Sequence, residues 1–373
     1  MKKLLAILVA LVLCLGSTAA MAELSDFDIV TNAEDNKVIL DCDMGYLGDD
    51  AWCMSILAQA DAGGYIDFLG VTSVGGNEIC AVGVNAILNQ LEEIERTDIP
   101  VYAGTDVPIM GFRDLAQDKP VTGGFQWTGG YRQLENYVSP DQYHNLGDLV
   151  NEEWGYSETE VQEQHAVDFM IEQVHKYPGQ VTIIAVGACT NVALAIKEDP
   201  TFAENTAGIY YMGGAIDVPG NDTPCAERNW YYDPEAVDIC LQADFPLQVV
   251  VPHDISFNQK LTKDLVEKIV NAGDTPYTQL VEEYAYPTFV ETPDRKQSLW
   301  DAQVPGIFLC PDLISVSDQR DIAMETNMGY TYGESVAWAA GTGPSTSATC
   351  TVVYDVDTEA YWSFVAELYG TQF

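Results

Sequence analysis

Short apolar runs alternate with longer amphipathic stretches from residue 38 onward, and this alternation is the strongest constraint on the fold. The apolar runs predict strands buried on both faces, at residues 38–40, 68–74, 101–102, 181–186, 209–212 and 247–251. Helical periodicity lies between them, in the stretches 51–60, 81–94, 161–174, 192–196, 234–241 and 261–270. Such alternation predicts an α/β fold with an open, mainly parallel, twisted sheet flanked by helices.

Two regions depart from this alternation. Residues 105–160 contain Gly, Trp and Tyr with little periodicity, which predicts a long insertion. Its place after a strand makes it a candidate lid, and an ordinary surface excursion is the alternative. Near the C-terminus, residues 335–340 and 349–354 predict a strand pair, and residues 359–369 predict a closing helix. No linker divides the chain, so we expect residues 23–373 to form one domain.

The N-terminus has the pattern of a secretory signal peptide. Two lysines precede an apolar run at residues 4–15, and small side chains stand at Ala20 and Ala22. This pattern predicts a signal peptide over residues 1–22, cleavage after Ala22, and a secreted or periplasmic protein. The run is shorter than the roughly 18 residues that span a bilayer, so a transmembrane anchor is not expected.

The charge balance is strongly acidic. The chain has 57 Asp and Glu against 16 Lys and Arg, a formal net charge of −41. Such a surface repels phosphate backbones and anionic lipid heads, so nucleic acids and membranes are not expected as partners. Cations and neutral polar ligands fit this charge. The sequence leaves the oligomeric state open, a homo-oligomer included.

Cysteine usage gives little information on disulfides. Eight of the nine cysteines follow Ala22, and export would permit bridges between them. However, Cys42, Cys189 and Cys310 lie within or at the end of apolar runs, where cysteine usually packs as a small hydrophobic residue. We therefore expect at most one or two disulfides.

Four carboxylates lie within ten residues at the end of the first strand. Asp41 and Asp43 share one face of the strand, and a glycine-flanked turn returns the chain to Asp49 and Asp50 at the start of the next helix. For either of the last two alone, a helix cap would be the simpler explanation. Four together must protonate or share a cation. Because hard divalent ions prefer oxygen ligands, the cluster predicts a site for Ca²⁺ or Mg²⁺.

The same Asp-x-Asp pattern permits a second interpretation. Haloacid-dehalogenase-like phosphatases present a nucleophile and an acid in this way, but Gly45 stands where that family has Thr or Val. A phosphatase also needs a positively charged side chain to bind phosphate, and this chain has few lysines to supply one. The motifs of serine hydrolases and P-loop proteins are absent from the sequence.

Further polar residues follow the other predicted strands. Asn77 follows the second strand in GVTSVGGN, Thr190 follows another in AVGACTNVA, and a third segment reads YYMGGAIDVPGNDTPCAERNWYYDPEA. Together with DCDMGYLGDDA, these segments resemble the inosine-uridine nucleoside N-ribohydrolase family from about residue 37 to the C-terminus. The resemblance implies the Rossmann-like nucleoside hydrolase fold, and hydrolysis of ribonucleosides to ribose and free base.

The resemblance also implies a role for each matching residue. Asp43, Asp50 and Asp301 look like carboxylate ligands of a Ca²⁺ ion, and Thr190 looks like a ligand through its backbone carbonyl. Asp43 is also similar to the base that deprotonates the attacking water. Positions that orient the site or contact ribose are matched by Asp41, Asp49, Asn77, Met212, Asn221, Glu227 and Asn229. For Glu227 the alternative is a salt bridge to Arg228 or Arg132, and for Met212 it is packing in the core.

The sequence departs from the family at two places. Met44 replaces the usual proline and two extra residues precede Asp49, as in a divergent branch with a longer turn. Trp300 stands where classical members place a histidine that helps the base to leave. A tryptophan stacks on a purine but cannot protonate it, so Trp300 becomes a candidate base contact. His144, within residues 105–160, is an alternative proton donor.

Two hypotheses follow from these residues. The first is a secreted, Ca²⁺-dependent nucleoside N-glycosidase. The second is a protein of the same fold that binds a nucleoside or sugar without cleaving it, which Trp300 and the altered turn would favour. The sequence does not fix whether the base is a purine or a pyrimidine.

Overall fold

The computed structural model describes residues 24–30, 33–45, 48–123 and 155–373. The predicted signal peptide, Arg132 and His144 lie outside these residues, as does most of the predicted insertion at 105–160. Within the described part of that insertion, residues 115–122 form a helix.

The centre of the fold is a nine-stranded sheet in the order β3-β2-β1-β4-β5-β6-β9-β7-β8. The strands are β1 (Lys37–Cys42), β2 (Asp67–Ser73), β3 (Val101–Ala103), β4 (Val181–Ala185), β5 (Gly208–Met212), β6 (Gln248–Val251), β7 (Ile314–Met324), β8 (Ser335–Ala339) and β9 (Ala348–Val356). All neighbours from β3 to β9 in this order pair in parallel. The six predicted strands and the mainly parallel α/β sheet are therefore confirmed.

The predicted strand pair near the C-terminus is wrong. Strands β8 and β9 are both present, but β7 lies between them and pairs antiparallel with each. The sequence of β7, ISVSDQRDIAM, has no apolar run because residues 316–319 face solvent and only the end of the strand is buried. A half-exposed strand of this kind gives a weaker pattern than the strands buried on both faces.

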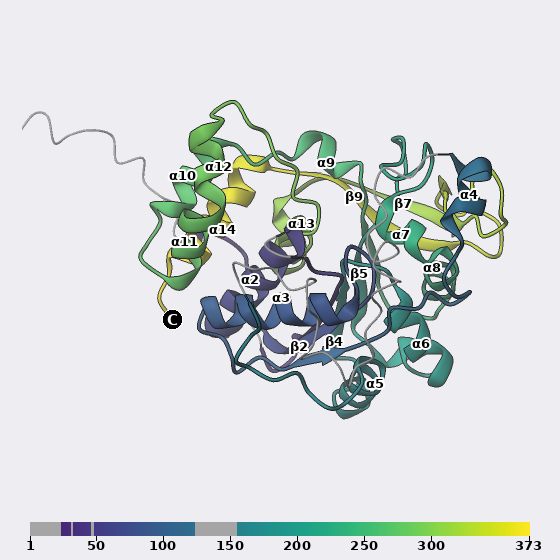
Figure 1. The fold of residues 1–373 in the computed structure, drawn as a ribbon, viewed down its shortest axis with the longest axis horizontal. Helices are drawn as coiled ribbons and strands as arrows, with labels where there is room; N and C mark the ends of the chain where they lie inside the picture. The colour runs from purple at the N-terminus through teal and green to yellow at the C-terminus, as the bar shows by residue number, and fades with distance from the viewer. Residues whose placement is uncertain (1–23, 31–32, 46–47, 124–154) are drawn as a thin grey trace, which may run out of the picture.

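Helices cover the sheet on both faces (Figure 1). They are α2 (Asp49–Ala62), α3 (Cys80–Glu93), α4 (Leu115–Thr122), α5 (Ala166–Lys176), α6 (Thr190–Glu198), α7 (Arg228–Tyr232), α8 (Pro234–Leu241), α9 (Ile255–Asn258), α10 (Lys263–Val270), α11 (Pro276–Leu280), α12 (Tyr286–Glu291), α13 (Gln303–Leu309) and α14 (Thr358–Gly370). A π-helical turn, Val281–Ala285, joins α11 to α12.

Helix α5 begins later than the expected residue 161. Its first residue is Ala166, because the His165 ring accepts a hydrogen bond from the Val167 backbone and caps the helix. Gln162, just before this cap, forms an isolated bridge with Tyr102 next to β3. The predicted closing helix is confirmed as α14.

Strand β1 shows how the core is divided. Val38 and Leu40 pack into one hydrophobic cluster together with residues of α2, α3, α13 and α14. Ile39 points the other way, into a second cluster with residues of α5, α6 and α8. Because all three side chains are fully buried, the strand reads as a continuous apolar run. Because side chains alternate between the two faces of a strand, Asp41 lies on the same face as Ile39, toward α6.

The cysteines behave as small hydrophobic residues. All eight cysteines in the described part of the chain are unbridged, and Cys42, Cys189 and Cys310 are buried as expected.

Within the described residues, the structure has no helix with the length and hydrophobicity needed to cross a bilayer.

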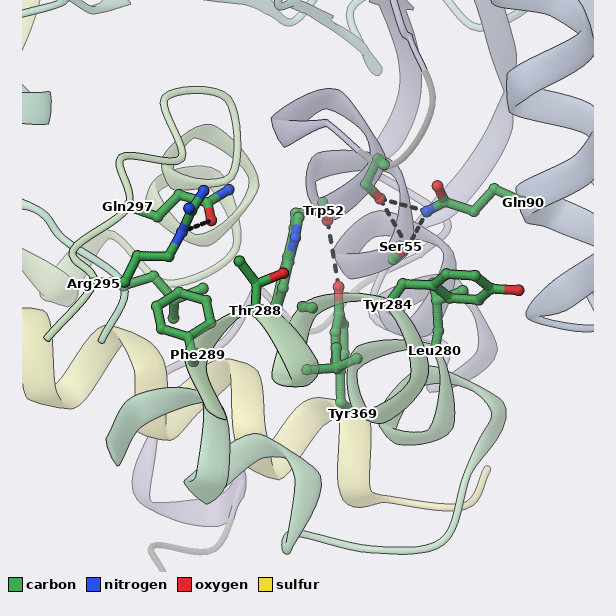
Figure 2. Close-up of a pocket in the computed structure, with 14 residues that line it drawn as sticks. Trp52, Ser55, Gln90, Leu280, Tyr284, Thr288, Phe289, Arg295, Gln297 and Tyr369 are labelled. Carbon is green, nitrogen blue, oxygen red and sulfur yellow. Dashed lines mark hydrogen bonds between the residues drawn. The ribbon is translucent and has the colours of Figure 1, made fainter. Parts of the chain in front are cut away.

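A cavity of about 220 Å³ lies beside the first turns of α2 (Figure 2). On its wall, the Gln90 amide donates to Ala51 O and to Ser55 Oγ, both at 2.7 Å. The Tyr369 hydroxyl donates to Trp52 O at 3.4 Å. These bonds tie the start of α2 to α3 and α14, and so fix the helix that begins with Asp49 and Asp50. The predicted site residues are not part of the lining.

Candidate active site

An acid cluster lies where β1, α2 and the segment before α13 meet. One carboxylate oxygen from each of Asp49, Asp50 and Asp301 lies within 4.8 Å of the others. Gly48 caps α2 with its backbone alone, so the first two acids lie in the first helical turn, where the free N–H groups favour negative charge. Asp301 comes from a distant part of the chain and arrives because α13 packs against α2.

The chemistry of this acid cluster fits a divalent cation. The oxygens Asp50 Oδ1 and Asp301 Oδ1 are buried and have no hydrogen-bond partner within the described residues. Two full charges at 4.8 Å repel by about 3 kcal/mol at an effective dielectric constant of about 20. Burial and the neighbouring carboxylates accordingly raise the pKa of Asp50 and of Asp301 well above the ordinary value. A bound cation would reverse this effect.

Asp43 lies beside the acid cluster and is held by Asn77. The Asn77 backbone N–H donates to Asp43 Oδ2 at 2.6 Å, and its side-chain amide donates to Oδ1 at 3.2 Å. A Cβ at Gly76 would lie 2.0 Å from Asp43 Oδ2, and one at Gly187 would lie 2.8 Å from the Asp43 backbone nitrogen, so both positions need glycine. Burial raises the pKa of Asp43 to about 6, against the lowering effects of Asn77 and Arg228.

Asp41 does not join the other three acids of the first strand end. Its Oδ1 accepts hydrogen bonds from Thr72 Oγ1 at 2.6 Å and from Asn191 Nδ2 at 2.8 Å. Burial raises its pKa to about 7. The reason for the separation is that β1 ends after Cys42, so Asp41 stays within the sheet facing α6. Its hydrogen bonds therefore tie Asp41 to β2 and α6 rather than to the acid cluster.

Thr190 begins α6 at the carboxyl end of β4, the strand next to β1. Its hydroxyl donates to Asp233 Oδ2 at 2.7 Å. Asp233 also accepts from the Ile109 backbone at 2.8 Å and caps α8 through Ala236 at 3.1 Å. This fully buried carboxylate therefore fixes the turn that carries the Thr190 carbonyl group.

Glu227 is held by backbone donors. Its carboxylate caps α7, accepting from Asn229 N at 2.9 Å and Trp230 N at 3.1 Å, and it also accepts from Gly214 N at 3.0 Å. Burial raises its pKa to about 7 despite these donors. The carboxylate is thereby fixed between the end of β5 and the start of α7.

The remaining predicted ribose contacts are Met212 at the end of β5, Asn221 in the loop that follows, and Asn229 in α7. The Asn229 amide donates to Val186 O at 2.9 Å and to Met212 O at 3.2 Å, which joins the ends of β4 and β5. The Met212 sulfur also lies 3.2 Å from this amide, so Met212 is packed in the core as well as placed at the site. Asn221 Oδ1 accepts from the Arg228 backbone at 2.9 Å.

Trp300 makes two contacts that fix its position. Its backbone N–H donates to Asp49 Oδ2 at 3.2 Å, and its indole N–H donates to His253 Nδ1 at 3.0 Å. An indole nitrogen only donates, so Nδ1 of His253 is the acceptor and the ring is neutral with its proton on Nε2. Burial lowers the pKa of His253 in agreement with this state.

Sequence reasoning assigned no role in the site to three residues that the structure brings there. His253 comes two residues after the apolar run 247–251, so the strand-end rule that selected Asn77 would also have found it. Asn191 stands next to Thr190 and carries the same signal. In the sequence, Arg228 stands between Glu227 and Asn229, two predicted ribose contacts. The only role considered for it was an ion pair with Glu227.

Comparison with known proteins identifies the family. The family model described as "Inosine-uridine preferring nucleoside hydrolase" matches residues 38–363. The chain belongs to this family. Membership confirms the resemblance seen in the sequence and the predicted enzyme class, a nucleoside N-ribohydrolase. It also disfavours the phosphatase interpretation.

Relatives and solved structures agree with this assignment. The pyrimidine-specific ribonucleoside hydrolase RihB of Escherichia coli O9:H4 (strain HS) is 28% identical over 339 residues, covering 90% of this chain and 97% of the relative. The structure of the plant nucleoside hydrolase PpNRh1 is 26% identical, with a TM-score of 0.70, covering 91% of this chain and all of that one. The purine-preferring ribonucleoside hydrolase from Gardnerella vaginalis shares the fold at 21% identity, with a TM-score of 0.67, covering 90% and 98%.

Without a cation, the protein should become less stable as the pH rises. The ordinary pKa of an aspartate is 3.8, and burial raises that of Asp41 to about 7 and that of Asp43 to about 6. Between these values the folded state keeps protons that the unfolded chain has released, so the free energy of unfolding falls from about pH 4 to about pH 7. Chemical denaturation in the presence of a chelator measures this fall, and Ca²⁺ should reverse it.

Two variants separate the acid cluster from the general surface charge. Asp301→Asn should show a smaller fall with pH and less stabilisation by Ca²⁺, because one buried carboxylate is gone. Asp264→Asn, an exposed acid on α10, should behave like the wild type. Equal behaviour of the two variants would contradict the assignment of the metal site.

Proposed function

We propose that the protein hydrolyses ribonucleosides to ribose and free base with Ca²⁺ as its metal ion. The observation that carries this proposal is the acid cluster of Asp49, Asp50 and Asp301, with its unpartnered buried oxygens, beside the oriented carboxylate of Asp43. Three carboxylates and a backbone carbonyl, completed by water and ribose hydroxyls, would supply the roughly 6–8 oxygen ligands of Ca²⁺, whereas Mg²⁺ usually keeps several waters and uses one or two carboxylates.

Four residues would hold the ion. Asp43, Asp50 and Asp301 offer carboxylates, and Thr190 offers its backbone carbonyl at the end of β4. Asp49 lies among these acids and is tied to the Trp300 backbone, which suits a residue that orients the site and the ribose. When bound, Ca²⁺ lowers the pKa of the attacking water and attracts the ribose hydroxyl groups.

Asp43 is the proposed general base. Asn77 donates to both of its carboxylate oxygens, so the group is held in one orientation. A general base must lie within hydrogen-bond reach of the proton that it takes, so a carboxylate held in one orientation beside the acid cluster suits this role.

The ribose would lie toward the ends of β2, β4 and β5. Asn77 follows β2, Met212 ends β5, and the segment from β5 into α7 adds Asn221, Glu227 and Asn229. Their amide and carboxylate groups suit a sugar with several hydroxyls. Cleavage of the glycosidic bond develops positive charge on the ribose, as in other glycoside hydrolyses. The surrounding carboxylates stabilise that charge.

Activity and its metal dependence are measured together. The purified protein with Ca²⁺ should release reducing sugar and free base from a panel of ribonucleosides. A chelator should abolish release, and Ca²⁺ should restore it better than Mg²⁺. Asp43→Asn should lower kcat by roughly 10²–10⁴-fold, the usual contribution of a general base, while the exposed control Asp264→Asn should retain full activity.

Other outcomes of this assay select other functions. Calorimetry showing tight nucleoside binding without release of base would favour the non-catalytic binding protein. Release of phosphate from a generic ester, dependent on Mg²⁺, would favour a phosphatase. Either result would contradict the proposed function.

Trp300 should make turnover sensitive to the leaving group. An indole cannot protonate a departing base, so the wild type should cleave p-nitrophenyl riboside, whose leaving group needs no proton, faster than inosine. Trp300→His should raise kcat for inosine and leave the nitrophenyl substrate little changed. Trp300→Phe keeps an aromatic ring without a donor and should retain the wild-type ratio. An unchanged ratio in the histidine variant would place the acid elsewhere, for example at His253.

We also propose that the chain is exported. The support is the pattern of residues 1–22, with its lysines, apolar run and small residues at Ala20 and Ala22. When the full chain is produced in a bacterium, the protein recovered outside the cytoplasm should begin at Glu23, as determined by N-terminal sequencing. Arginine at positions 20 and 22 should block cleavage. An uncut protein that stays in the cytoplasm would contradict export.

A further inference from the structure

Arg228 places a positive charge among the carboxylates of the site. It is the first residue of α7, and its side chain is 16% exposed. Its Nε donates to Asn77 Oδ1 at 3.0 Å, and its Nη1 donates to Asp222 Oδ2 at 3.3 Å. Its backbone N–H donates to Asn221 Oδ1. The side chain is thus held at both ends and reaches from the start of α7 to the loop after β2.

The contact between Arg228 and Asn77 fixes how the Asn77 amide is turned. A guanidinium nitrogen can only donate, so the amide oxygen of Asn77 must face Arg228. The amide nitrogen must then face the opposite side, where Asp43 Oδ1 lies 3.2 Å away. If the amide were reversed, the Asn77 amide oxygen would face Asp43 Oδ1 at this distance, and Oδ1 would lose the hydrogen bond that the amide nitrogen donates.

The orientation of Asn77 in turn fixes Asp43. The backbone N–H of Asn77 holds Oδ2 and its amide holds Oδ1, so rotation of the carboxylate about its Cβ–Cγ bond would break one of these bonds. The neighbouring glycines Gly76 and Gly187 leave the carboxylate close to the backbone on both sides.

We propose that Arg228 is a positioning residue for Asp43 and acts through Asn77. The inference rests on the proposed function, because it assigns a purpose to the orientation of the proposed base. Within the described residues, the Arg228 side chain donates to Asn77 and Asp222, while its charge lowers the pKa of Asp43 without a hydrogen bond between the two. Its effect is to select the one amide orientation that places a donor on each oxygen of Asp43.

Three substitutions at one position separate the hydrogen bond from the charge. Arg228→Gln keeps a nitrogen donor the same number of bonds from Cα as Nε, but removes the charge. Arg228→Lys keeps the charge but carries its nitrogen one bond further out. Arg228→Met has similar length and neither property. Circular dichroism and the unfolding midpoint establish that each variant folds.

The proposal predicts an order of activities. Arg228→Met should lower kcat by roughly tenfold or more, the effect of one hydrogen bond to a charged group, with a smaller change in KM. Arg228→Gln should recover most of this loss, and Arg228→Lys should recover little. If Arg228→Lys is instead the more active of the two, the charge rather than the amide orientation matters, and the proposal is wrong.

A double-mutant cycle with Asn77→Ala tests whether Arg228 acts through Asn77. If it does, Arg228→Met should cause no further loss of kcat in the Asn77→Ala background. The Ca²⁺ affinity, measured by calorimetry, should show the same non-additivity, because Asp43 is a proposed ligand. Additive losses would overturn the proposal.

The double-mutant cycle also distinguishes failure of this proposal from failure of the proposed function. A wild type that binds Ca²⁺ but releases no base would contradict the function. The cycle would then compare the Ca²⁺ affinities of the variants in place of kcat. If Ca²⁺ does not bind either, the same cycle on the free energy of unfolding measures the contact between Arg228 and Asn77. Additivity there would show that the contact is not formed, and would overturn the proposal.

Discussion

The repulsion between buried carboxylates at the carboxyl end of β1 is the constraint on which the rest of the site depends. Asp50 and Asp301 have oxygens with no hydrogen-bond partner within the described residues, and Asp43 lies beside them. Such groups either hold protons or share a cation. The surroundings of the cluster suit the second state, since α2 turns its N-terminus toward the acids and the packing of α13 on α2 brings Asp301 to them.

Two contacts of the site join segments that are far apart in the sequence. Trp300 takes the place of a histidine, and the structure pairs its indole with His253, a neutral histidine from the end of β6. Arg228 brings a cation to within hydrogen-bond distance of Asn77, which holds the proposed base. In the proposed mechanism, Trp300 is the candidate contact of the leaving base, and Arg228 acts through Asn77 on the proposed base Asp43.

Much of the fold was predictable because strands buried on both faces give unbroken apolar runs. The runs around Val38, Val181 and Leu247 each predicted a strand of the parallel sheet, and the structure has all of them. Strand β7 was missed because its exposed half, with Asp318 and Gln319, gives no apolar run. Its insertion between β8 and β9 then overturned the predicted pairing, since pairing depends on segments far apart in the sequence rather than on local pattern.

The sequence by itself determined the fold class, the family and the acids that are close along the chain. One turn joins the pair Asp41 and Asp43 to the pair Asp49 and Asp50. These four acids are therefore close along the chain, and a cation site could be predicted from the sequence alone. The tertiary structure decided which acids meet, since it separates Asp41 from the acid cluster and brings Asp301 to it. It alone also decided the orienting contacts of Asn77 with Arg228 and of Trp300 with His253, which join segments 151 and 47 residues apart. Hydrogen bonds depend on distance and direction in space, and sequence spacing does not encode either one across such separations.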